Sequence, residues 1–296
     1  MEIKCNICPR RCGTDRKNSV GFCGTGVDIR AARAALHFWE EPCISGSRGS
    51  GAVFFCGCNL KCVFCQNREI SAGGGGTVIS PLELSEIFLK LQSAGAHNIN
   101  LVTPTHYVVQ IKEALSLLRE PLTIPIVYNC GGYESAEGLE ILKDDVAIYL
   151  TDMKYAESAL AQRYSGAADY YETAVSALKK MLLYAGTPKY DSDGIMQSGV
   201  IVRHLVLPGC RHDSIEILHR LKAEFGTSAF RLSLMSQFTP TENLQNYPEL
   251  NRRITSFEYN SVLDAALDLG FSDAYIQARS SAKPEYTPPF DLTGII

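Results

Sequence analysis

The sequence predicts an α/β fold in which parallel strands are joined by helices. After residue 50, short apolar segments with strand character alternate with segments of helical period. Such alternation implies parallel strands linked by right-handed crossovers. Before residue 50, a cysteine-rich segment replaces this regular pattern. We therefore expect an N-terminal cysteine-rich, metal-binding extension over residues 1–50 and an α/β domain over residues 51–296.

The first expected strand covers residues 52–56 and leads into a cysteine-rich loop. The next helix, 81–94, has Ser80 at its N-cap, Pro81 at its first position and Gly95 after its end. The remaining elements are expected in the order strand 98–103, helix 106–118, strand 125–130, helix 135–143, strand 146–151, helix 170–184, strand 200–207, helix 213–225, strand 230–235, helix 256–269 and short strand 274–277.

Six strong strand–helix units are fewer than the eight of a closed barrel. A partial barrel and an open doubly wound sheet both fit this pattern. In either fold, functional residues are expected at the carboxyl ends of the strands, in the loops that follow them.

Composition excludes several classes of protein. The 296 residues are 46% hydrophobic and 20% charged, which is ordinary for a globular protein. The net charge is −4 and no long block of Lys or Arg is present, so a general nucleic-acid binder is disfavoured. The chain has no run of about 18 apolar residues and no apolar signal-peptide core near its start. We expect a soluble, cytoplasmic protein with no membrane partner.

Cysteine is the unusual residue. Nine of the eleven cysteines fall within the first 65 residues. An odd count without a secretory signal argues against disulfides, and clustered thiols in a reducing compartment more often bind metal or perform redox chemistry.

Cys58, Cys62 and Cys65 follow the first strand with the spacing C-x3-C-x2-C. Thiolates at this spacing can converge on one iron–sulfur cluster, and three ligands leave one of four irons open. A structural zinc site fits less well because it normally needs four protein ligands. A thioredoxin-like motif fits less well because it has no third cysteine nearby.

With Phe64 before its third cysteine, this loop resembles the signature of the radical S-adenosylmethionine (SAM) superfamily. The stretch SGSRGSGAVFFCGCNLKCVFCQNREIS resembles pyruvate formate-lyase activating enzymes. A related branch of these enzymes has an extra N-terminal cysteine motif. The segments that resemble that branch are CNICPRRCGTDR, EEPCISGSRGSG, HNINLVTPTHYV, YLTDMKY and VRHLVLPG.

The resemblance implies a partial (β/α)6 barrel of the TIM type and a [4Fe–4S] cluster on Cys58, Cys62 and Cys65. SAM would chelate the open iron, and one electron would cleave it to methionine and a 5′-deoxyadenosyl radical that abstracts a hydrogen atom. It also implies an oxidoreductase of anaerobic metabolism, an electron donor of the flavodoxin or ferredoxin type, and a glycyl radical enzyme as the protein substrate.

SAM contacts are expected from Phe64, Asn67, Thr103, Thr105, Asn129, Asp152 and Lys154. The sequence departs from the family at the second strand, where Thr103-Pro104-Thr105-His106 replaces a Gly-Gly-Glu-type segment. Asp152-Met153-Lys154 resembles the Asp-x-Lys segment of the activating enzymes. An Asn129 turn cap and an Asp152–Lys154 surface salt bridge are the alternative interpretations.

Arg203 and His204 interrupt an apolar strand, VIVRHLVL, and a buried cation there needs a partner. A carboxylate of SAM or of the substrate would be one, and a satisfied polar group of the core is the alternative. His106 has the same two interpretations, substrate-side catalysis or packing.

The second set of thiols is Cys5, Cys8, Cys12 and Cys23. Four thiols can close a metal site without other ligands, and we expect either an auxiliary [4Fe–4S] cluster or a structural Zn²⁺. Residues 1–50 carry eight Lys or Arg and five Asp or Glu, a net charge of +3. An acidic electron donor would fit this basic segment, although a solvated face is the commoner explanation.

Three functions follow. The first is a radical SAM enzyme similar to the activases of glycyl radical enzymes. The second is a radical SAM enzyme acting on a small molecule or a peptide. The third is a non-enzymatic iron–sulfur electron carrier or a zinc-binding interaction protein, which needs neither an open iron nor a large α/β domain.

Overall fold

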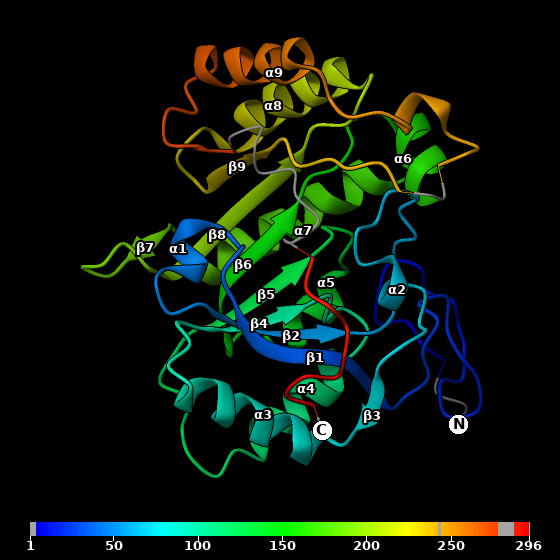
Figure 1. Ribbon diagram of the computed structural model, residues 1–296, viewed down its shortest axis with the longest axis vertical. Helices are drawn as coiled ribbons and strands as arrows, with labels where there is room; N and C mark the ends of the chain where they lie inside the picture. The colour runs from blue at the N-terminus through cyan, green and yellow to red at the C-terminus, as the bar shows by residue number, and fades with distance from the viewer. Residues whose placement is uncertain (1–3, 242–243, 278–286, 296) are drawn as a thin grey trace.

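The computed structural model describes residues 4–241, 244–277 and 287–295. Its main feature is one twisted sheet with the strand order β10-β9-β8-β6-β5-β4-β2-β1-β3 (Figure 1). All neighbours from β2 to β10 along this order are parallel, whereas β1 pairs antiparallel with both β2 and β3. The fold is the partial (β/α)6 barrel of the TIM type, and not the open doubly wound sheet that the sequence also allowed.

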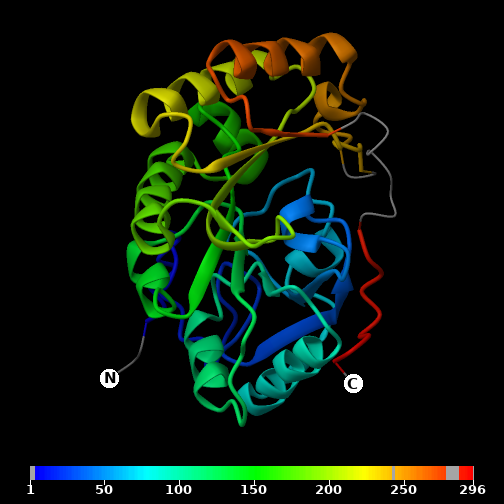
Figure 2. The same ribbon diagram turned by 90° about the vertical axis from the view of Figure 1, so that its left-hand side faces the viewer.

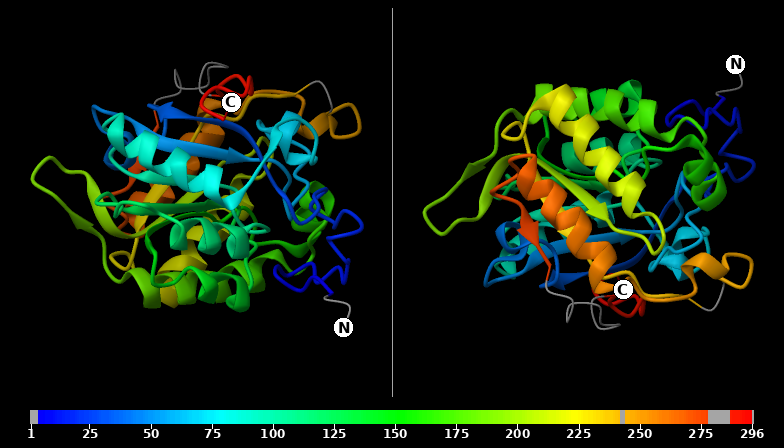
Figure 3. Two further views of the ribbon diagram at one scale, coloured as in Figure 1. Left: turned by 90° about the horizontal axis from the view of Figure 1, so that it is seen from below. Right: turned by 90° about the horizontal axis from the view of Figure 1, so that it is seen from above.

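The strand bounds place the six predicted parallel strands within a few residues of expectation. They are β2 (Ser50–Phe55), β4 (Ile99–Val102), β5 (Ile126–Cys130), β6 (Val146–Asp152), β8 (Met196–Leu205) and β9 (Arg231–Met235), followed by short β10 (Tyr275–Ile276). The outer strands are β1 (Ile29–His37) and β3 (Thr77–Ile79), and β7 (Lys189–Tyr190) pairs with β8 in a hairpin that projects from the side of the molecule (Figure 3).

Helices of 6 to 16 residues lie along the outer face of the sheet (Figure 1). They are α3 (Pro81–Ser93), α4 (Val108–Ser116), α5 (Ala136–Ile141), α7 (Tyr170–Ala185), α8 (Arg211–Phe225) and α9 (Ser256–Asp268). Short helical segments are α1 (Pro42–Ser45), α2 (Arg68–Ser71), α6 (Ser158–Ser165) and η1 (Pro248–Leu250). The predicted start of α3 is confirmed, because Ser80 and Glu83 form a reciprocal capping box.

Strand β1 was not predicted. Its sequence, IRAARAALH, is rich in Ala and Arg, which favour helix over strand. Tertiary pairing overrides that preference, because β1 hydrogen-bonds to β2 on one side and to β3 on the other. Residues 29–37 are therefore part of the sheet, although they fall within the expected extension.

The segment 287–295 follows β1 on its outer side (Figure 2). The Ala34 N–H donates to the carbonyl of Thr293 and the Leu292 N–H donates to that of Ala32. Arg33 and Asp291 form a salt bridge of 2.7 Å. In the described part of the chain, no helix is both long enough and apolar enough to cross a bilayer.

Candidate metal and cofactor site

Cys58, Cys62 and Cys65 lie together at the carboxyl end of β2. All three line one cavity of about 210 Å³, whose wall also includes Asn129 and Asp152 from the ends of β5 and β6. This is the edge where a parallel barrel gathers residues from several strands. The three thiols, Asn129 and Asp152 therefore meet at the edge where the sequence analysis expected candidate residues.

The three thiols are close enough to influence one another. Burial raises the pKa of Cys58 above its usual range, and Cys62 and Cys65 raise it further. Burial likewise raises the pKa of Cys65, with Cys62 adding to the effect. A metal centre that binds thiolates removes this penalty, because its positive charge offsets their repulsion.

The donor set fits a cluster of several irons. No three His, Cys, Asp or Glu side chains in the described ranges lie close enough to hold a single metal ion. A cluster does not require that closeness, because each thiolate binds a different iron and the cluster separates them.

One cluster-side sulfur receives a buried hydroxyl. Ser165 Oγ donates to Cys62 Sγ at 2.9 Å, and the Tyr155 hydroxyl lies 2.7 Å from Ser165 Oγ. Ser165 and Tyr155 are both fully buried. Neither residue was predicted, because both reach Cys62 from about 100 residues along the chain, Tyr155 after the end of β6 and Ser165 at the end of α6.

Beside the thiols lies a charged network centred on Arg203. Its Nε donates to Asp152 Oδ1 at 2.9 Å, its Nη1 to Glu40 Oε2 at 3.2 Å and its Nη2 to Asn129 Oδ1 at 2.7 Å. Lys154 Nζ donates to Asp152 Oδ2 at 2.5 Å. The partners of Arg203 are thus protein carboxylates and an amide, rather than the ligand carboxylate considered from the sequence.

The network also sets the charge of its members. Burial alone would raise the pKa of Asp152, but Arg203 and Lys154 outweigh it and hold that pKa below its usual value. Burial opposes the charge of Lys154, yet Asp152 and the Cys62 thiol raise its pKa overall. The cavity therefore contains an ionised carboxylate and a protonated amine.

Glu40 was missed by the sequence analysis. Its carboxylate accepts from Asn129 at 3.0 Å and from Asn100 at 3.2 Å, in addition to Arg203. It reaches the cavity from the loop after β1, a strand that the local pattern does not reveal. It stands at the start of the segment EEPCISGSRGSG, whose resemblance to the activating-enzyme branch was the one sequence signal near it.

Thr103 lines the same cavity with a left-handed backbone, φ +60°. A β-branched residue in this region is a strained exception, and such strain is concentrated at functional sites. The Thr103 N–H donates to the carbonyl of Asn129 at 2.8 Å, which holds the turn in place. Asn67, at the start of α2, also lines the cavity.

Four predicted residues lie outside the lining of this cavity. Thr105 donates its hydroxyl to buried Glu134 at 2.8 Å, and Phe64 packs against Phe238. His106 Nε2 lies 2.8 Å from the Cys56 carbonyl and His204 Nδ1 lies 2.7 Å from the Met153 carbonyl. Burial lowers the pKa of each histidine to about 4, so both rings are neutral.

The N-terminal thiols form a second group. The Cys5 N–H donates to the Thr14 carbonyl and the Gly13 N–H returns to the Cys5 carbonyl, which closes a small loop. A Cβ placed on Gly21 would lie 3.5 Å from the sulfurs of both Cys12 and Cys23. Cys12 and Cys23, eleven positions apart in the sequence, therefore lie on either side of Gly21.

Their acidities differ. Burial raises the pKa of Cys8 to about 11, and the nearby thiols of Cys5 and Cys23 contribute. Burial also acts against ionisation of Cys12, but hydrogen bonds from Thr14, the Phe22 backbone and Cys5 outweigh it and lower the pKa to about 7. One member of the group therefore ionises readily, as a metal ligand must.

Arg10 joins this N-terminal group to the cavity loop. Its guanidinium donates to the carbonyls of Asn59 at 2.8 Å and Ser165 at 3.0 Å. It also stacks 4.3 Å from the Phe22 ring centre and 5.0 Å from that of Tyr133.

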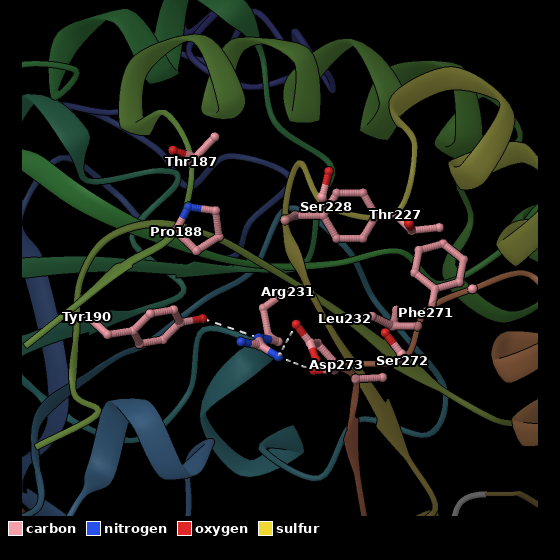
Figure 4. A pocket seen from close by; sticks show the side chains of 13 residues that line it. Thr187, Pro188, Tyr190, Thr227, Ser228, Arg231, Leu232, Phe271, Ser272 and Asp273 are labelled. Atoms are coloured by element: carbon pink, nitrogen blue, oxygen red, sulfur yellow. Dashed lines mark hydrogen bonds and ion pairs between the residues drawn. The ribbon is translucent and has the colours of Figure 1, made fainter.

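Another cavity, of about 300 Å³, lies at the amino end of the parallel strands, where β9 begins (Figure 4). Arg231 crosses it between the Tyr190 hydroxyl and Asp273. This cavity shares no lining residue with the cavity of the three thiols, which lies at the carboxyl end of the strands.

Known proteins resemble this chain in sequence. Residues 52–209 match the Radical SAM superfamily. An uncharacterized protein of Methanocaldococcus jannaschii is 31% identical over 271 residues, which cover 88% of this chain and 74% of that protein.

Solved structures are more distant. SuiB of Streptococcus suis, bound to the precursor peptide SuiA, is 13% identical, covers 71% of this chain and has a TM-score of 0.46. The [FeFe]-hydrogenase maturase HydG of Carboxydothermus hydrogenoformans is 15% identical, covers 72% and has a TM-score of 0.47. This chain spans 43% of the SuiB chain and 49% of the HydG chain.

Proposed function

Because this chain belongs to the radical SAM superfamily, we propose that Cys58, Cys62 and Cys65 hold a [4Fe–4S] cluster at which SAM binds. When bound, the cluster supplies one electron that cleaves SAM to methionine and a 5′-deoxyadenosyl radical, and this radical abstracts a hydrogen atom from the substrate. Membership of an enzyme superfamily also removes the reason to retain a non-enzymatic electron carrier or zinc-binding protein.

One observation carries the proposal: the three thiols line the same cavity as a charged network suited to an amino acid moiety. The Lys154 ammonium can pair with a carboxylate, whereas Asp152 can accept from an ammonium or a ribose hydroxyl. Asn129 offers an amide, and the strained turn at Thr103 presents a hydroxyl and a carbonyl where other members use a glycine-rich segment.

Arg203 acts as a positioning residue in this scheme. Its three nitrogens are committed to Asp152, Glu40 and Asn129, so it orients two proposed SAM contacts without touching SAM. Apolar Phe54, Leu60 and Val102 form part of the same wall and limit the entry of water.

The substrate class follows from the resemblance to activating enzymes. We propose hydrogen abstraction from a backbone glycine of a partner glycyl radical enzyme. The open barrel supports this, because β10 and β3 are separate edges of the described sheet and a polypeptide loop can approach between them. A flavodoxin- or ferredoxin-type donor would deliver the electron.

The N-terminal thiols, Cys5, Cys8, Cys12 and Cys23, are proposed to hold an auxiliary metal centre, either a second [4Fe–4S] cluster or Zn²⁺. The placement of Cys12 and Cys23 around Gly21 and the lowered pKa of Cys12 support a centre of this kind.

Anaerobic reconstitution tests both sites. Wild-type protein should form 5′-deoxyadenosine from SAM after reduction, and a triple Cys58→Ala, Cys62→Ala, Cys65→Ala variant should not. Equal behaviour of the two proteins would end the proposal. About eight irons per chain would indicate two clusters, whereas four irons with one zinc would indicate a structural ion. An EPR doublet from an incubated partner would identify glycine abstraction, and its absence with every partner tried would count against the activase assignment.

A further inference from the structure

A second cavity of about 230 Å³ adjoins the proposed SAM site. Its wall comes from both sides of the open barrel: the loop after β1 contributes Glu41, and β9 and the end of β10 contribute Ser233 and Gln277. The two cavities share Trp39, Glu40, Arg203 and Gln237. A group bound in the second cavity would therefore lie next to the cofactor.

Glu41 is the unusual member of this wall. It is only 8% exposed, and among the described residues its Oε2 has no hydrogen-bond partner. A buried acceptor without a partner destabilises the fold, and a charged one does so more strongly. Such groups call for an explanation, and a missing ligand is one.

The surroundings of Glu41 disfavour a negative charge on its carboxyl group. Burial raises the pKa of Glu41, Arg203 opposes that effect and Glu40 adds to it. Arg203 is the one cation among the described residues of this wall, and each of its nitrogens already donates to another group. Across the two adjoining cavities, the described lining has three carboxylates, Glu40, Glu41 and Asp152, and two cations, Arg203 and Lys154.

These facts decide the kind of ligand. An anion would meet excess negative charge, and the described wall offers it no cation except Arg203, which already pairs with Asp152 and Glu40, so an anion is disfavoured. A ligand cation with N–H donors would satisfy the orphaned acceptor and balance the charge. The aromatic rings of Trp39 and Tyr275, which also line the cavity, can flank such a group.

We propose that this cavity is a substrate subsite that binds a primary ammonium group through the Glu41 carboxylate. The inference rests on the proposed function only in naming the ligand a substrate. Its volume corresponds to about eight waters at roughly 30 Å³ each, which is enough for an aminoalkyl group. An amine-bearing small molecule, or an amine-bearing side chain or terminus of a peptide, has this chemistry.

Trp39 makes the test direct, because it is the chain's single tryptophan and lines the cavity. Its fluorescence is titrated with propylammonium, propionamide and propionate on the reconstituted protein. We expect saturable binding of propylammonium, with a Kd on the order of millimolar for so small a ligand, and no saturable change with propionate. Equal responses to the three probes, or a preference for propionate, would overturn the proposal.

A matched pair of variants locates the effect. Glu41→Gln keeps the size of the side chain and removes its charge, and we expect propylammonium affinity to fall by about tenfold or more. Glu224→Gln removes a carboxylate on α8 that pairs with Lys179 and should bind as wild type. Unchanged affinity in Glu41→Gln would contradict the assignment.

The titrations of wild-type protein with the three probes test the proposal even if a variant fails to fold. SAM cleavage is measured on the same samples. Formation of 5′-deoxyadenosine without ammonium binding would overturn this inference alone, whereas ammonium binding without SAM cleavage would overturn the proposed function alone.

Discussion

The Cys58 N–H donates to the carbonyl of Cys23 at 3.2 Å. One residue belongs to the loop of the proposed cluster and the other to the N-terminal group of thiols. The two proposed metal centres are therefore joined by a direct backbone contact. This contact requires close approach at Gly57, whose φ is +90°.

The first prediction concerns that approach. A Cβ at position 57 would lie 2.8 Å from the Cys23 carbonyl oxygen and 2.6 Å from Thr25 Cγ2. We expect Gly57→Ala to lower the free energy of unfolding by about 2–4 kcal/mol, from strain and clash together. It should also reduce the iron retained after reconstitution, measured by metal analysis, because the loop of Cys58 is displaced.

Gly209→Ala is the matched control. Gly209 has a φ of +78°, yet nothing lies within 4 Å of an added Cβ. It should show only the backbone strain and retain its iron. If both variants lose equal stability and iron, the close approach at Gly57 has no special role.

The second prediction concerns the hydroxyl on Cys62. A hydrogen bond to a ligating thiolate favours the reduced cluster, which carries more negative charge. Ser165→Ala should therefore lower the midpoint potential of the cluster by tens of millivolts, an order of magnitude set by the strength of such a bond. A redox titration followed by EPR measures it.

Tyr155→Phe separates this effect from simple packing. It removes the outer hydroxyl and leaves the bond from Ser165 to Cys62 intact, so a smaller shift is expected. Identical potentials in wild type and Ser165→Ala would exclude a role for this hydroxyl.

The third prediction concerns pH. Burial raises the pKa of Glu134 to about 7, although Thr105 and Tyr128 donate to it. A raised carboxyl pKa weakens the fold as pH rises between the unfolded and folded values, because the unfolded chain ionises first. Wild type should lose up to about 3 kcal/mol relative to Glu134→Gln between pH 4.5 and 7. Chemical denaturation across this range measures the difference, and parallel pH profiles of the two proteins would contradict the assignment.

The sequence could predict the parts of the site that depend on local pattern. The apolar runs of β2, β5 and β6 are clear in the sequence. They place the thiol loop after β2, and Asn129 and Asp152 at the ends of β5 and β6. Glu40 could not be predicted, because it depends on β1, whose Ala- and Arg-rich sequence forms a strand only through pairing. The partners of Arg203 were also out of reach, since they lie 51, 74 and 163 residues away.

The histidines show a different limit. His106 and His204 look chemically useful in sequence, but each donates a ring N–H to a backbone carbonyl within the core. Whether a polar residue on a strand points into a cavity or into the core depends on packing, which spacing does not encode.

The last prediction concerns Arg203 itself. Its side chain and those of Glu40 and Asp152 are 15%, 11% and 15% exposed, so the ion pairs are largely buried. Arg203→Met should lower the free energy of unfolding at neutral pH by about 3–5 kcal/mol, because buried Glu40 loses its cation and Asp152 keeps only Lys154. The lowered pKa of Asp152 stabilises the fold above the usual Asp pKa of about 3.9, and that contribution is lost as pH falls through the folded value. The deficit of Arg203→Met should therefore shrink in acid.

Arg220→Met is the control, because its pairs with Glu216 and Glu157 are exposed and should cost under about 1 kcal/mol at any pH. A deficit in Arg203→Met that is no larger than in Arg220→Met, or that does not change with pH, would show that the network around Asp152 does not depend on this cation.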